Sequence, residues 1–247
     1  MELTISVITA VYNGAATIGD MLQSLDAQTW PGVQHVVIDG GSTDGTADIV
    51  RGRPRPGRVV LSERDRGIYD ALNKGLRVCS GDVVGILHAD DVYAHAQVLE
   101  LVAAAFADPQ TDAVYGDLEY VSSTSGRVVR RWRAGPYSPR RLGRGWMPPH
   151  PTLFVRRSVY ERLGGFDTRY RIAADYDLIL RFLGQGRLQP AYIPEVLVRM
   201  RLGGVSNRSL GNILRKSAED YRALRRNAVG GLGALCWKNL SKLGQFF

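Results

Sequence analysis

Two adjacent carboxylates, Asp90 and Asp91, are the residues of this sequence whose type and spacing most directly suggest chemistry. They follow a mostly apolar run, Val83 to Leu87, that is too short for an ordinary helix and predicts a strand buried on both faces of a parallel sheet. Open α/β sheets bind ligands beyond the carboxyl ends of their strands, where paired carboxylates suit a divalent cation carrying a substrate diphosphate. The alternative is that one aspartate caps a helix beginning near Ala94.

Asp39 and Lys74 are further candidates for a ligand site. Asp39 ends a second predicted strand, where a lone carboxylate accepts hydrogen bonds from a base or sugar edge; alternatively, it only forms the glycine-rich turn that follows. Lys74 lies on the polar side of a predicted helix, where a cation would suit a diphosphate; the alternative is a solvated lysine. His88 and His95 have no recognisable metal-ligand spacing and are interpreted as packing or surface residues.

Asp175 is a further candidate carboxylate, and it lies at the start of a helical pattern. The apolar face of that predicted helix comprises Ile172, Tyr176, Ile179, Leu180 and Leu183. At about 100° per residue, Asp175 lies at the edge of this face and Asp177 points further away, which predicts Asp175 as the more enclosed carboxylate. The alternative is an N-cap, since an aspartate at a helix start bonds to backbone amides.

The elements that must position these residues alternate between strands and helices. Predicted strands cover residues 3–11, 36–38, 59–61, 83–87, 113–118, 128–132 and 152–155, and predicted helices cover residues 18–25, 68–79, 95–106 and 172–183. A strand, helix and strand in succession form a right-handed βαβ unit by default. The predicted fold class is therefore α/β, with a mostly parallel sheet flanked by helices.

Composition predicts one domain and a tail. The chain has 247 residues, of which 45% are hydrophobic, and we assign residues 1–206 to the domain and 207–247 to the tail. No apolar run approaches the ~20 residues of a membrane-spanning helix, and Met1 leads into strand-like sequence without a signal peptide, so we expect a soluble, cytoplasmic protein. Cys79 and Cys236 lie far apart and predict free thiols.

The tail carries most of the net charge of +8, with eight cations against two carboxylates. Because the positive charge belongs to one appendage, we expect no nucleic-acid partner. Apolar and aromatic residues alternate with these cations, namely Ile213, Leu214, Tyr221, Leu224, Leu232, Leu235, Trp237, Leu240, Leu243, Phe246 and Phe247. The pattern predicts a basic amphipathic helix on an anionic membrane surface, and the alternative is a helix packed back on the domain. A second basic stretch, Arg127 to Arg144, would face phospholipid or an acceptor's pyrophosphate.

Several short motifs occur in a fixed order along residues 3–206, and this order is more specific than any single motif. The motifs are Ser6-Val-Ile-Thr-Ala-Val-Tyr-Asn13, Asp39-Gly-Gly-Ser-Thr-Asp-Gly-Thr46, Gly67-Ile-Tyr-Asp-Ala-Leu-Asn-Lys-Gly75, Ala89-Asp90-Asp91, His150-Pro-Thr-Leu-Phe-Val-Arg-Arg157, Gly164-Gly-Phe-Asp167 and Ala173-Ala-Asp-Tyr-Asp177. Together they resemble the glycosyltransferase family 2 enzymes. The resemblance is closest to the bacterial, colanic-acid-type branch that builds exopolysaccharide and lipopolysaccharide repeat units.

The resemblance implies a GT-A fold, a nucleotide-diphosphate-sugar donor, and Mn or Mg as cofactor. It places Ala10, Tyr12, Asp39, Asp65, Lys74 and Asp90 on the donor-nucleotide side, Asp90 and Asp91 at the metal, Asp175 as the catalytic base, and His150 and Arg201 on the acceptor or phosphate side. One departure is His88, which stands at the first position of the family's Asp-x-Asp-Asp pattern and leaves the metal's ligand set open. Arg201 lies where members often carry a metal-binding histidine.

The expected function is an inverting, metal-dependent transfer of one sugar to a hydroxyl of a lipid-linked glycan in cell-surface polysaccharide synthesis, with the tail as a peripheral anchor on the inner face of the plasma membrane. Processive relatives carry Q/R-x-x-R-W beyond the base, whereas Arg131-Trp132 precedes Asp175 here, so a single transfer is expected. Two alternatives are a nucleotidyltransferase on a related fold, which usually has a basic loop after the first strand, and a non-catalytic nucleotide-sugar-binding or scaffold protein, which has no use for Asp175.

Overall fold

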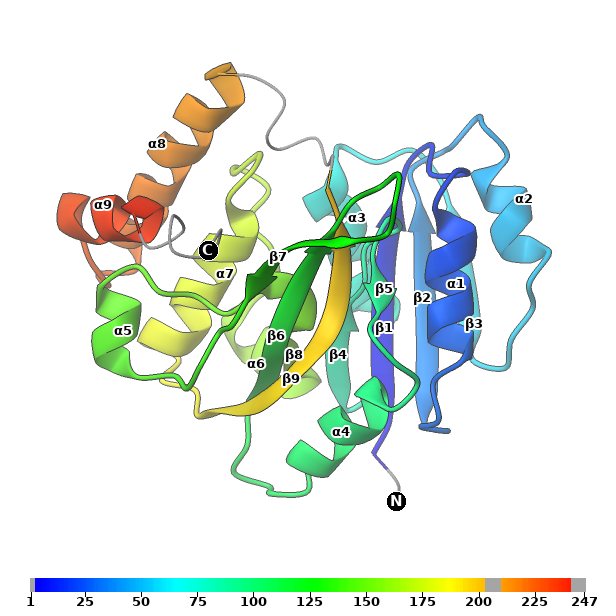
Figure 1. Ribbon diagram of the computed structural model, residues 1–247, viewed down its shortest axis with the longest axis horizontal. Helices are drawn as coiled ribbons and strands as arrows, with labels where there is room; N and C mark the ends of the chain where they lie inside the picture. Colours follow the sequence, from blue (N-terminus) through cyan, green and yellow to red (C-terminus); the bar gives the residue numbers. More distant parts are fainter. Residues whose placement is uncertain (1–2, 203–209, 241–247) are drawn as a thin grey trace.

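A single mixed sheet organises the computed structural model. Residues 3–202 and 210–240 are described, and within them nine strands form this sheet in the order β3-β2-β1-β4-β8-β6-β9-β5, with β7 paired to β6 (Figure 1). The strands are β1 (Ile5–Val11), β2 (Val33–Asp39), β3 (Arg58–Ser62), β4 (Val83–Ile86), β5 (Val92–Tyr93), β6 (Ala113–Val121), β7 (Val128–Trp132), β8 (Phe154–Arg156) and β9 (Pro190–Arg201). The helices are α1 (Ile18–Asp26), α2 (Thr46–Arg51), α3 (Ile68–Val78), α4 (Val98–Ala105), α5 (Pro139–Gly143), α6 (Arg157–Leu163), α7 (Ala174–Leu180), α8 (Leu210–Arg226) and α9 (Leu232–Leu240), with the short turns η1 (His150–Thr152) and η2 (Arg181–Gln185).

The N-terminal half of the sheet is parallel, as predicted. β1 lies between β2 and β4, and β3 extends the sheet beyond β2, all in one direction. The register pairs Asp39 with Val11 on one side and with Ser62 on the other. Because parallel strands end at the same edge, the predicted ligand residues after β1, β2 and β4 meet at one edge of the sheet.

In the other half of the sheet, β8 runs antiparallel between β4 and β6, β9 runs parallel to β6, and β5 pairs antiparallel with β9.

The strand β5 shows why neither aspartate of the doublet caps a helix. Val92 already pairs with Arg199, and α4 begins only at Val98 with Gln97 as its N-cap. The helix-cap alternative is therefore wrong, and the helix predicted from His95 starts three residues later because a short strand precedes it.

Both faces of the sheet are covered, as a buried parallel sheet requires. Successive side chains of β1 alternate between two cores. Ile5 and Val7 pack with α1 and α4, whereas Ile8 and Ala10 pack with α3, α6 and α7. The buried positions of α1 are those predicted from helical spacing, namely Ile18, Met21, Leu22 and Leu25.

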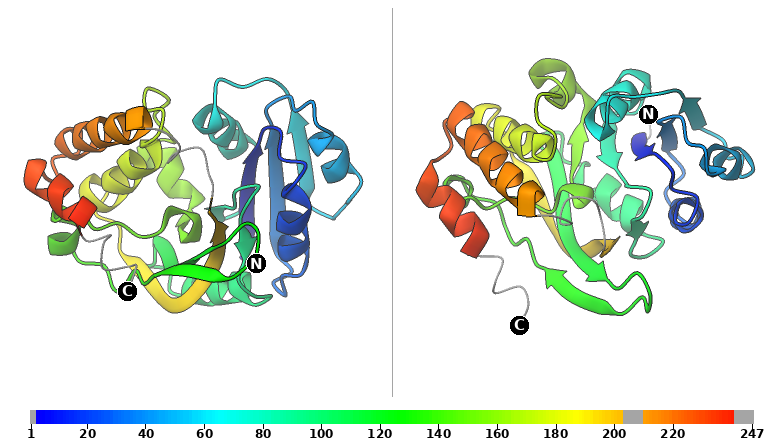
Figure 2. Two further views of the ribbon diagram at one scale, coloured as in Figure 1. Left: turned by 45° about the horizontal axis from the view of Figure 1, so that its top comes forward. Right: turned by 90° about the horizontal axis from the view of Figure 1, so that it is seen from above.

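The C-terminal helices pack on the domain. α8 lies alongside α7, and α9 folds back against α8 (Figure 2). Ala223 and Leu224 are fully buried, and Nζ of the buried Lys238 lies 2.8 Å from the Asp220 carboxylate. The described part of the tail therefore packs on the domain, and its contact with a membrane stays a prediction. The predicted boundary at residue 207, the cations Arg208 and Lys242, the side chains of Ile213, Leu214 and Leu240, and the end from Leu243 to Phe247 lie outside the described residues.

The sequence predicts that no helix spans a membrane and that both cysteines are free thiols. In the described part of the chain, no helix is long and apolar enough to cross a membrane. On α9, Leu232 and Trp237 remain 66% and 56% exposed, respectively. Cys79 is buried and Cys236 exposed, and both are free thiols, as predicted.

Candidate active site

Two interlocked turns form the N-terminal part of the site. The amide of Asn13 donates to Ser42 Oγ at 2.8 Å, and the amide of Thr43 donates to the Asn13 side chain at 2.9 Å. Asp39 is buried and accepts hydrogen bonds from the Ser42 amide and hydroxyl and from the Ser62 hydroxyl. The turn-forming interpretation of Asp39 is thus confirmed, and its binding of a base stays a prediction.

A cavity of about 680 Å³ opens where these turns face α7. The predicted site residues that line it are Ala10, Tyr12, Asp90, His150 and Asp175. The predicted site residues outside its lining are Asp39, Asp65, Lys74, Asp91 and Arg201. The fold therefore brings the predicted base into one space with part of the predicted donor side.

Predicted residues outside the cavity lining have partners of their own. Lys74 is not solvated, because its Nζ lies 2.7 Å from Glu63 and its side chain is only 12% exposed. Asp65 accepts a hydrogen bond from the amide two residues further on. Arg201 pairs with Asp20. Their roles toward a nucleotide or phosphate stay predictions, and Lys74 and Arg201 would have to exchange a carboxylate for a phosphate.

The carboxylate doublet combines one aspartate at the cavity with one buried behind it. Asp90 lines the cavity, whereas both carboxylate oxygens of the buried Asp91 lack a hydrogen-bond partner within the described ranges. Burial, and then the charge of Asp90, raise the pKa of Asp91 well above its ordinary value, although Arg201 opposes this. A buried carboxylate without partners is costly, so this pair has an unmet demand for positive charge.

The doublet fits a divalent cation that is bound partly by the protein and partly by a substrate. Among residues 3–202 and 210–240, no cluster of three or more His, Cys, Asp or Glu side chains could hold a metal, so these residues alone do not form a complete metal cage. Mg²⁺ usually binds one or two carboxylates and completes its shell with substrate phosphates and water. Asp90 and Asp91 match that ligand set, while His88 bonds to another histidine.

Asp175 lies in the first turn of α7 and contacts two side chains from other elements. His150 Nδ1 is 3.3 Å from Asp175 Oδ2, and the Tyr69 hydroxyl is 3.4 Å from Asp175 Oδ1. The N-cap of α7 is Ala173, so the alternative that Asp175 caps this helix is wrong. Tyr69 was missed, although it lies within the Gly67 to Gly75 motif, and its hydroxyl also donates to the Ile172 carbonyl at 2.6 Å.

Asp177, and not Asp175, is the more enclosed carboxylate, which corrects the sequence prediction. The side chain of Asp177 is 3% exposed and that of Asp175 is 23% exposed. Asn227, which follows α8, donates to Asp177 at 2.9 Å, and Arg181 lies 3.6 Å away. The helical projection was wrong because it could not include the C-terminal segment that covers the Asp177 side of α7.

Two neutral histidines extend the contacts of Asp175. His88 Nε2 lies 3.4 Å from His150 Nε2. Burial lowers the pKa of His88 to about 4 and also lowers the pKa of His150, against the opposing effect of Asp175, so both rings are neutral at pH 7. His150 therefore faces the Asp175 carboxylate with Nδ1 and His88 with Nε2. This arrangement orients Asp175 within the cavity.

The start of α7 is held by α8, a contact that the sequence analysis missed. Glu219 is buried, and its carboxylate accepts hydrogen bonds from the amides of Arg171, Ile172 and Ala173 at 3.2, 2.8 and 3.0 Å. Amides at a helix start lack partners within the helix, so Glu219 satisfies donors that would otherwise be unpaired. Arg171 and Arg215 also line the cavity and were not predicted.

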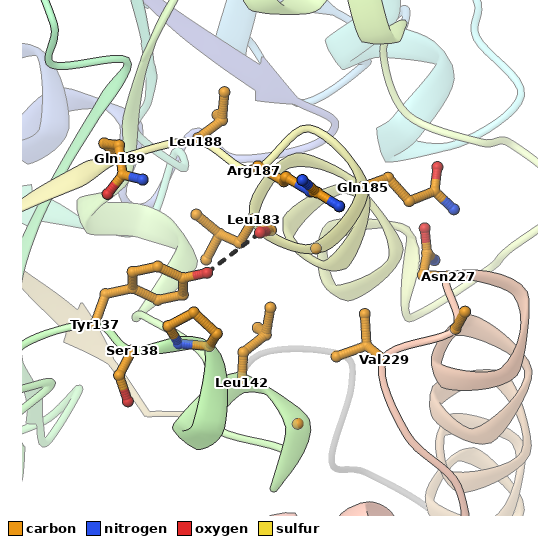
Figure 3. A pocket seen from close by; sticks show the side chains of 14 residues that line it. Tyr137, Ser138, Leu142, Leu183, Gln185, Arg187, Leu188, Gln189, Asn227 and Val229 are labelled. Atoms are coloured by element: carbon orange, nitrogen blue, oxygen red, sulfur yellow. Dashed lines mark hydrogen bonds between the residues drawn. The ribbon is translucent and has the colours of Figure 1, made fainter.

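A second cavity lies where α5, η2 and the turn between α8 and α9 meet (Figure 3). Its volume is about 850 Å³, and the Tyr137 hydroxyl at its wall donates to the Leu183 carbonyl at 3.2 Å. Its described lining contains no carboxylate, histidine or cysteine and none of the predicted site residues. The first cavity is therefore the candidate active site.

The comparison with known proteins defines the class of this chain. The domain described as glycosyl transferase family 2 matches residues 6–164, more than half of the chain. The chain therefore belongs to this family, which confirms the resemblance at family level and the expectation of a glycosyltransferase with an α/β GT-A fold. Membership favours the transferase over the nucleotidyltransferase and scaffold alternatives.

Individual relatives agree with this assignment. The chain is 33% identical over 207 residues to the "PGL/p-HBAD biosynthesis glycosyltransferase" of Mycobacterium bovis, covering 82% of this chain and 78% of that protein. Among solved structures it resembles S. aureus TarS 1-349 in complex with UDP-GlcNAc, with a TM-score of 0.70 and 19% identity over 92% of this chain and 66% of that one. The mannosyltransferase PcManGT from Pyrobaculum calidifontis, in complex with GDP-Man and Mn²⁺, gives a TM-score of 0.66 and 21% identity over 99% of this chain and 75% of that one. This chain spans only 39% of a longer TarS chain.

Proposed function

We propose that this protein transfers one sugar from a nucleotide-diphosphate-sugar to a hydroxyl of a lipid-linked glycan acceptor, with inversion at the anomeric carbon. The observation that carries the proposal is the cavity shared by Asp90 and Asp175, two carboxylates from opposite walls. Tyr12, which is 66% exposed and lines the same cavity, offers a ring for the nucleotide base. The nucleotide-sugars in the TarS and PcManGT complexes support this donor class.

The proposed reaction is a single in-line displacement. Asp175 takes the proton of the acceptor hydroxyl while that oxygen attacks the anomeric carbon and the carbon–oxygen bond to the diphosphate breaks, so the electron pair leaves with the nucleoside diphosphate. His150 and Tyr69 hold the carboxylate of Asp175 in place through their contacts. Mn or Mg, when bound by Asp90 and Asp91, supplies the positive charge that offsets the departing diphosphate.

A thermal-shift panel of UDP- and GDP-sugars, each with and without Mn²⁺, tests the donor and metal parts. One donor should raise the melting temperature only when Mn²⁺ is present, since a tight ligand stabilises the native state by mass action. Asp91→Asn should lose this response while the metal-free protein stays as stable as wild type or becomes more stable, because a partnerless buried carboxylate is removed. A panel without any Mn²⁺-dependent shift would overturn the proposal.

Access to a lipid-linked acceptor is proposed to involve α9. α9 exposes Leu232 and Trp237 and packs against α8, which carries exposed arginines, and apolar side chains together with cations suit an anionic membrane surface. Flotation with phosphatidylglycerol vesicles should recover wild type but not the Leu232→Ser, Trp237→Ser double variant. Equal flotation of both proteins would remove α9 from this role.

A further inference from the structure

We propose that Arg171 and Arg215 bind an anionic group of the acceptor, a phosphate or a carboxylate beside the sugar that receives the new linkage. This inference rests on the proposed function, because it takes the Asp175 side of the cavity as the acceptor side. It is based on where the charged residues lie around the cavity and on which of the cations form ion pairs.

The charged lining of the cavity divides between its walls. Asp90 follows β4 and lies with the residues after β1 on the proposed donor side. Asp175 is on α7, Arg171 precedes α7, and Arg215 is on α8, which packs against α7. Both cations in the described lining therefore belong to the wall of the proposed base.

Glu219 connects the backbone segments that carry the two arginines. Its carboxylate accepts a hydrogen bond from the Arg171 amide at 3.2 Å. Arg215 lies one turn earlier on α8, and residues four apart on a helix share one face. Both exposed arginines thus line one cavity from two backbone segments that Glu219 joins.

Neither guanidinium forms an ion pair with a carboxylate within the described ranges, whereas several other cations do. The paired cations are Lys74 with Glu63, Arg169 and Arg226 with Asp167, Arg201 with Asp20, and Lys216 with Asp220. Two cations that line one cavity repel each other, and an anion bound between them removes that repulsion. The planar guanidinium fork matches the oxygens of phosphate and carboxylate.

The second basic stretch is not a competing site for this anion. None of its arginines lines the cavity. Arg131 lies 2.9 Å from Glu119, and Arg141 donates to the Ala134 carbonyl at 3.1 Å. These contacts leave Arg171 and Arg215 as the cations placed to recognise an acceptor group in the cavity.

Calorimetry with three matched decyl sugars tests the inference. The probes are neutral decyl glucoside, decyl glucuronide with a carboxylate, and glucose joined to decanol through a phosphodiester, each titrated into protein saturated with Mn²⁺ and UDP or GDP to fill the donor side. We expect one anionic probe to bind at least about tenfold more tightly than the neutral one, as for a charge-assisted hydrogen bond. The preferred probe identifies the anion.

The variants decide whether the two arginines cause this preference. Arg171→Gln and Arg215→Gln should each weaken it, and the double variant should abolish it. Arg225→Gln, which removes an exposed cation of α8 that does not line the cavity, should retain it. Equal binding of all probes, binding of none, or a preference that survives in the double variant would overturn the inference.

The nucleotide affinity of the same proteins separates this inference from the proposed function. The double variant should bind UDP or GDP with Mn²⁺ as tightly as wild type. If its nucleotide affinity fell instead, the arginines would serve the donor, so the inference would be wrong while the proposed function stood. If wild type bound neither nucleotide, the proposed function itself would fail.

Discussion

Asp175 is the carboxylate of α7 that reaches the cavity, while Asp177, two residues later, is enclosed by a salt bridge and an amide. The two aspartates share a helix and differ in surroundings. His150 Nδ1 in η1 lies 3.3 Å from Asp175 Oδ2, so the orientation of the proposed base depends on a residue from another part of the chain. This difference allows a matched test of their roles.

Asp175→Asn should lower kcat by at least about 10²-fold, because an amide cannot accept the proton of the acceptor hydroxyl. Donor binding should be unchanged, because the substitution keeps the shape of the side chain. The same change at Asp177 should lower the melting temperature, since it removes a buried charge paired with Arg181, and leave most of kcat. Normal turnover of Asp175→Asn, measured as release of nucleoside diphosphate, would exclude Asp175 as the base.

At the scale of elements, the C-terminal helix α8 is part of the site and not an appendage. Glu219 satisfies amides at the start of α7, Asn227 just beyond the helix bonds to Asp177, and Arg215 lines the cavity. All three residues lie beyond the segment matched by the family domain, residues 6–164. The position of Asp175 therefore depends on a helix outside that match.

Glu219→Ala should destabilise the protein by about 1–3 kcal/mol, because it leaves buried amides without an acceptor. Its kcat should also fall, and Glu219→Gln, which keeps one acceptor oxygen, should restore part of both. Glu161→Gln on α6 is the matched control, since that side chain is 59% exposed and its change should stay within about 0.5 kcal/mol. Urea unfolding and steady-state kinetics on the same samples give both quantities. An unchanged kcat in Glu219→Ala would leave Glu219 with a structural role only.

Elements with strong periodicity were predictable, and contacts between distant elements were not. The spacing of apolar residues predicted β1, α1, β4 and the parallel half of the sheet, because buried faces impose their period on the sequence. β5 was missed because two residues carry no period. The buried state of Asp177 and the contacts of Glu219 were unpredictable, since they depend on where α8 packs.

At the scale of the whole molecule, a buried series of hydrogen bonds between strands of the sheet makes the stability of the protein depend on pH. Arg58 donates to His35 Nδ1 at 3.0 Å, so His35 Nε2 carries the hydrogen and faces Thr9 Oγ1 at 3.1 Å. Thr9 in turn donates to the Leu87 carbonyl at 2.9 Å. Burial, followed by the charges of Arg58 and Arg55, lowers the pKa of His35 from 6.5 to about 3.

The unfolded chain therefore binds one more proton than the native protein between these two pKa values. The contribution of His35 to the free energy of unfolding is fully present above pH 6.5. Below that pH, the free energy of unfolding falls by about 1.4 kcal/mol per pH unit as the pH decreases toward 3. His35→Gln should flatten the dependence of the free energy of unfolding on pH between 6 and 4 by about that slope. His95→Gln is the control variant, because His95 is not part of this hydrogen-bonded chain. Identical slopes in wild type and His35→Gln would show that His35 is not the group responsible.

The whole account depends on the edge of the sheet where the strand ends meet α7, and on the demand for positive charge at Asp90 and Asp91. An anomalous difference map from a crystal soaked with Mn²⁺ and the nucleoside diphosphate of the preferred donor tests it most directly. The account predicts a Mn²⁺ peak in contact with a carboxylate oxygen of Asp90 or Asp91 and with the diphosphate, inside the cavity that Asp175 lines. A nucleotide bound in that cavity without Mn²⁺ at the doublet, or bound elsewhere, would contradict it.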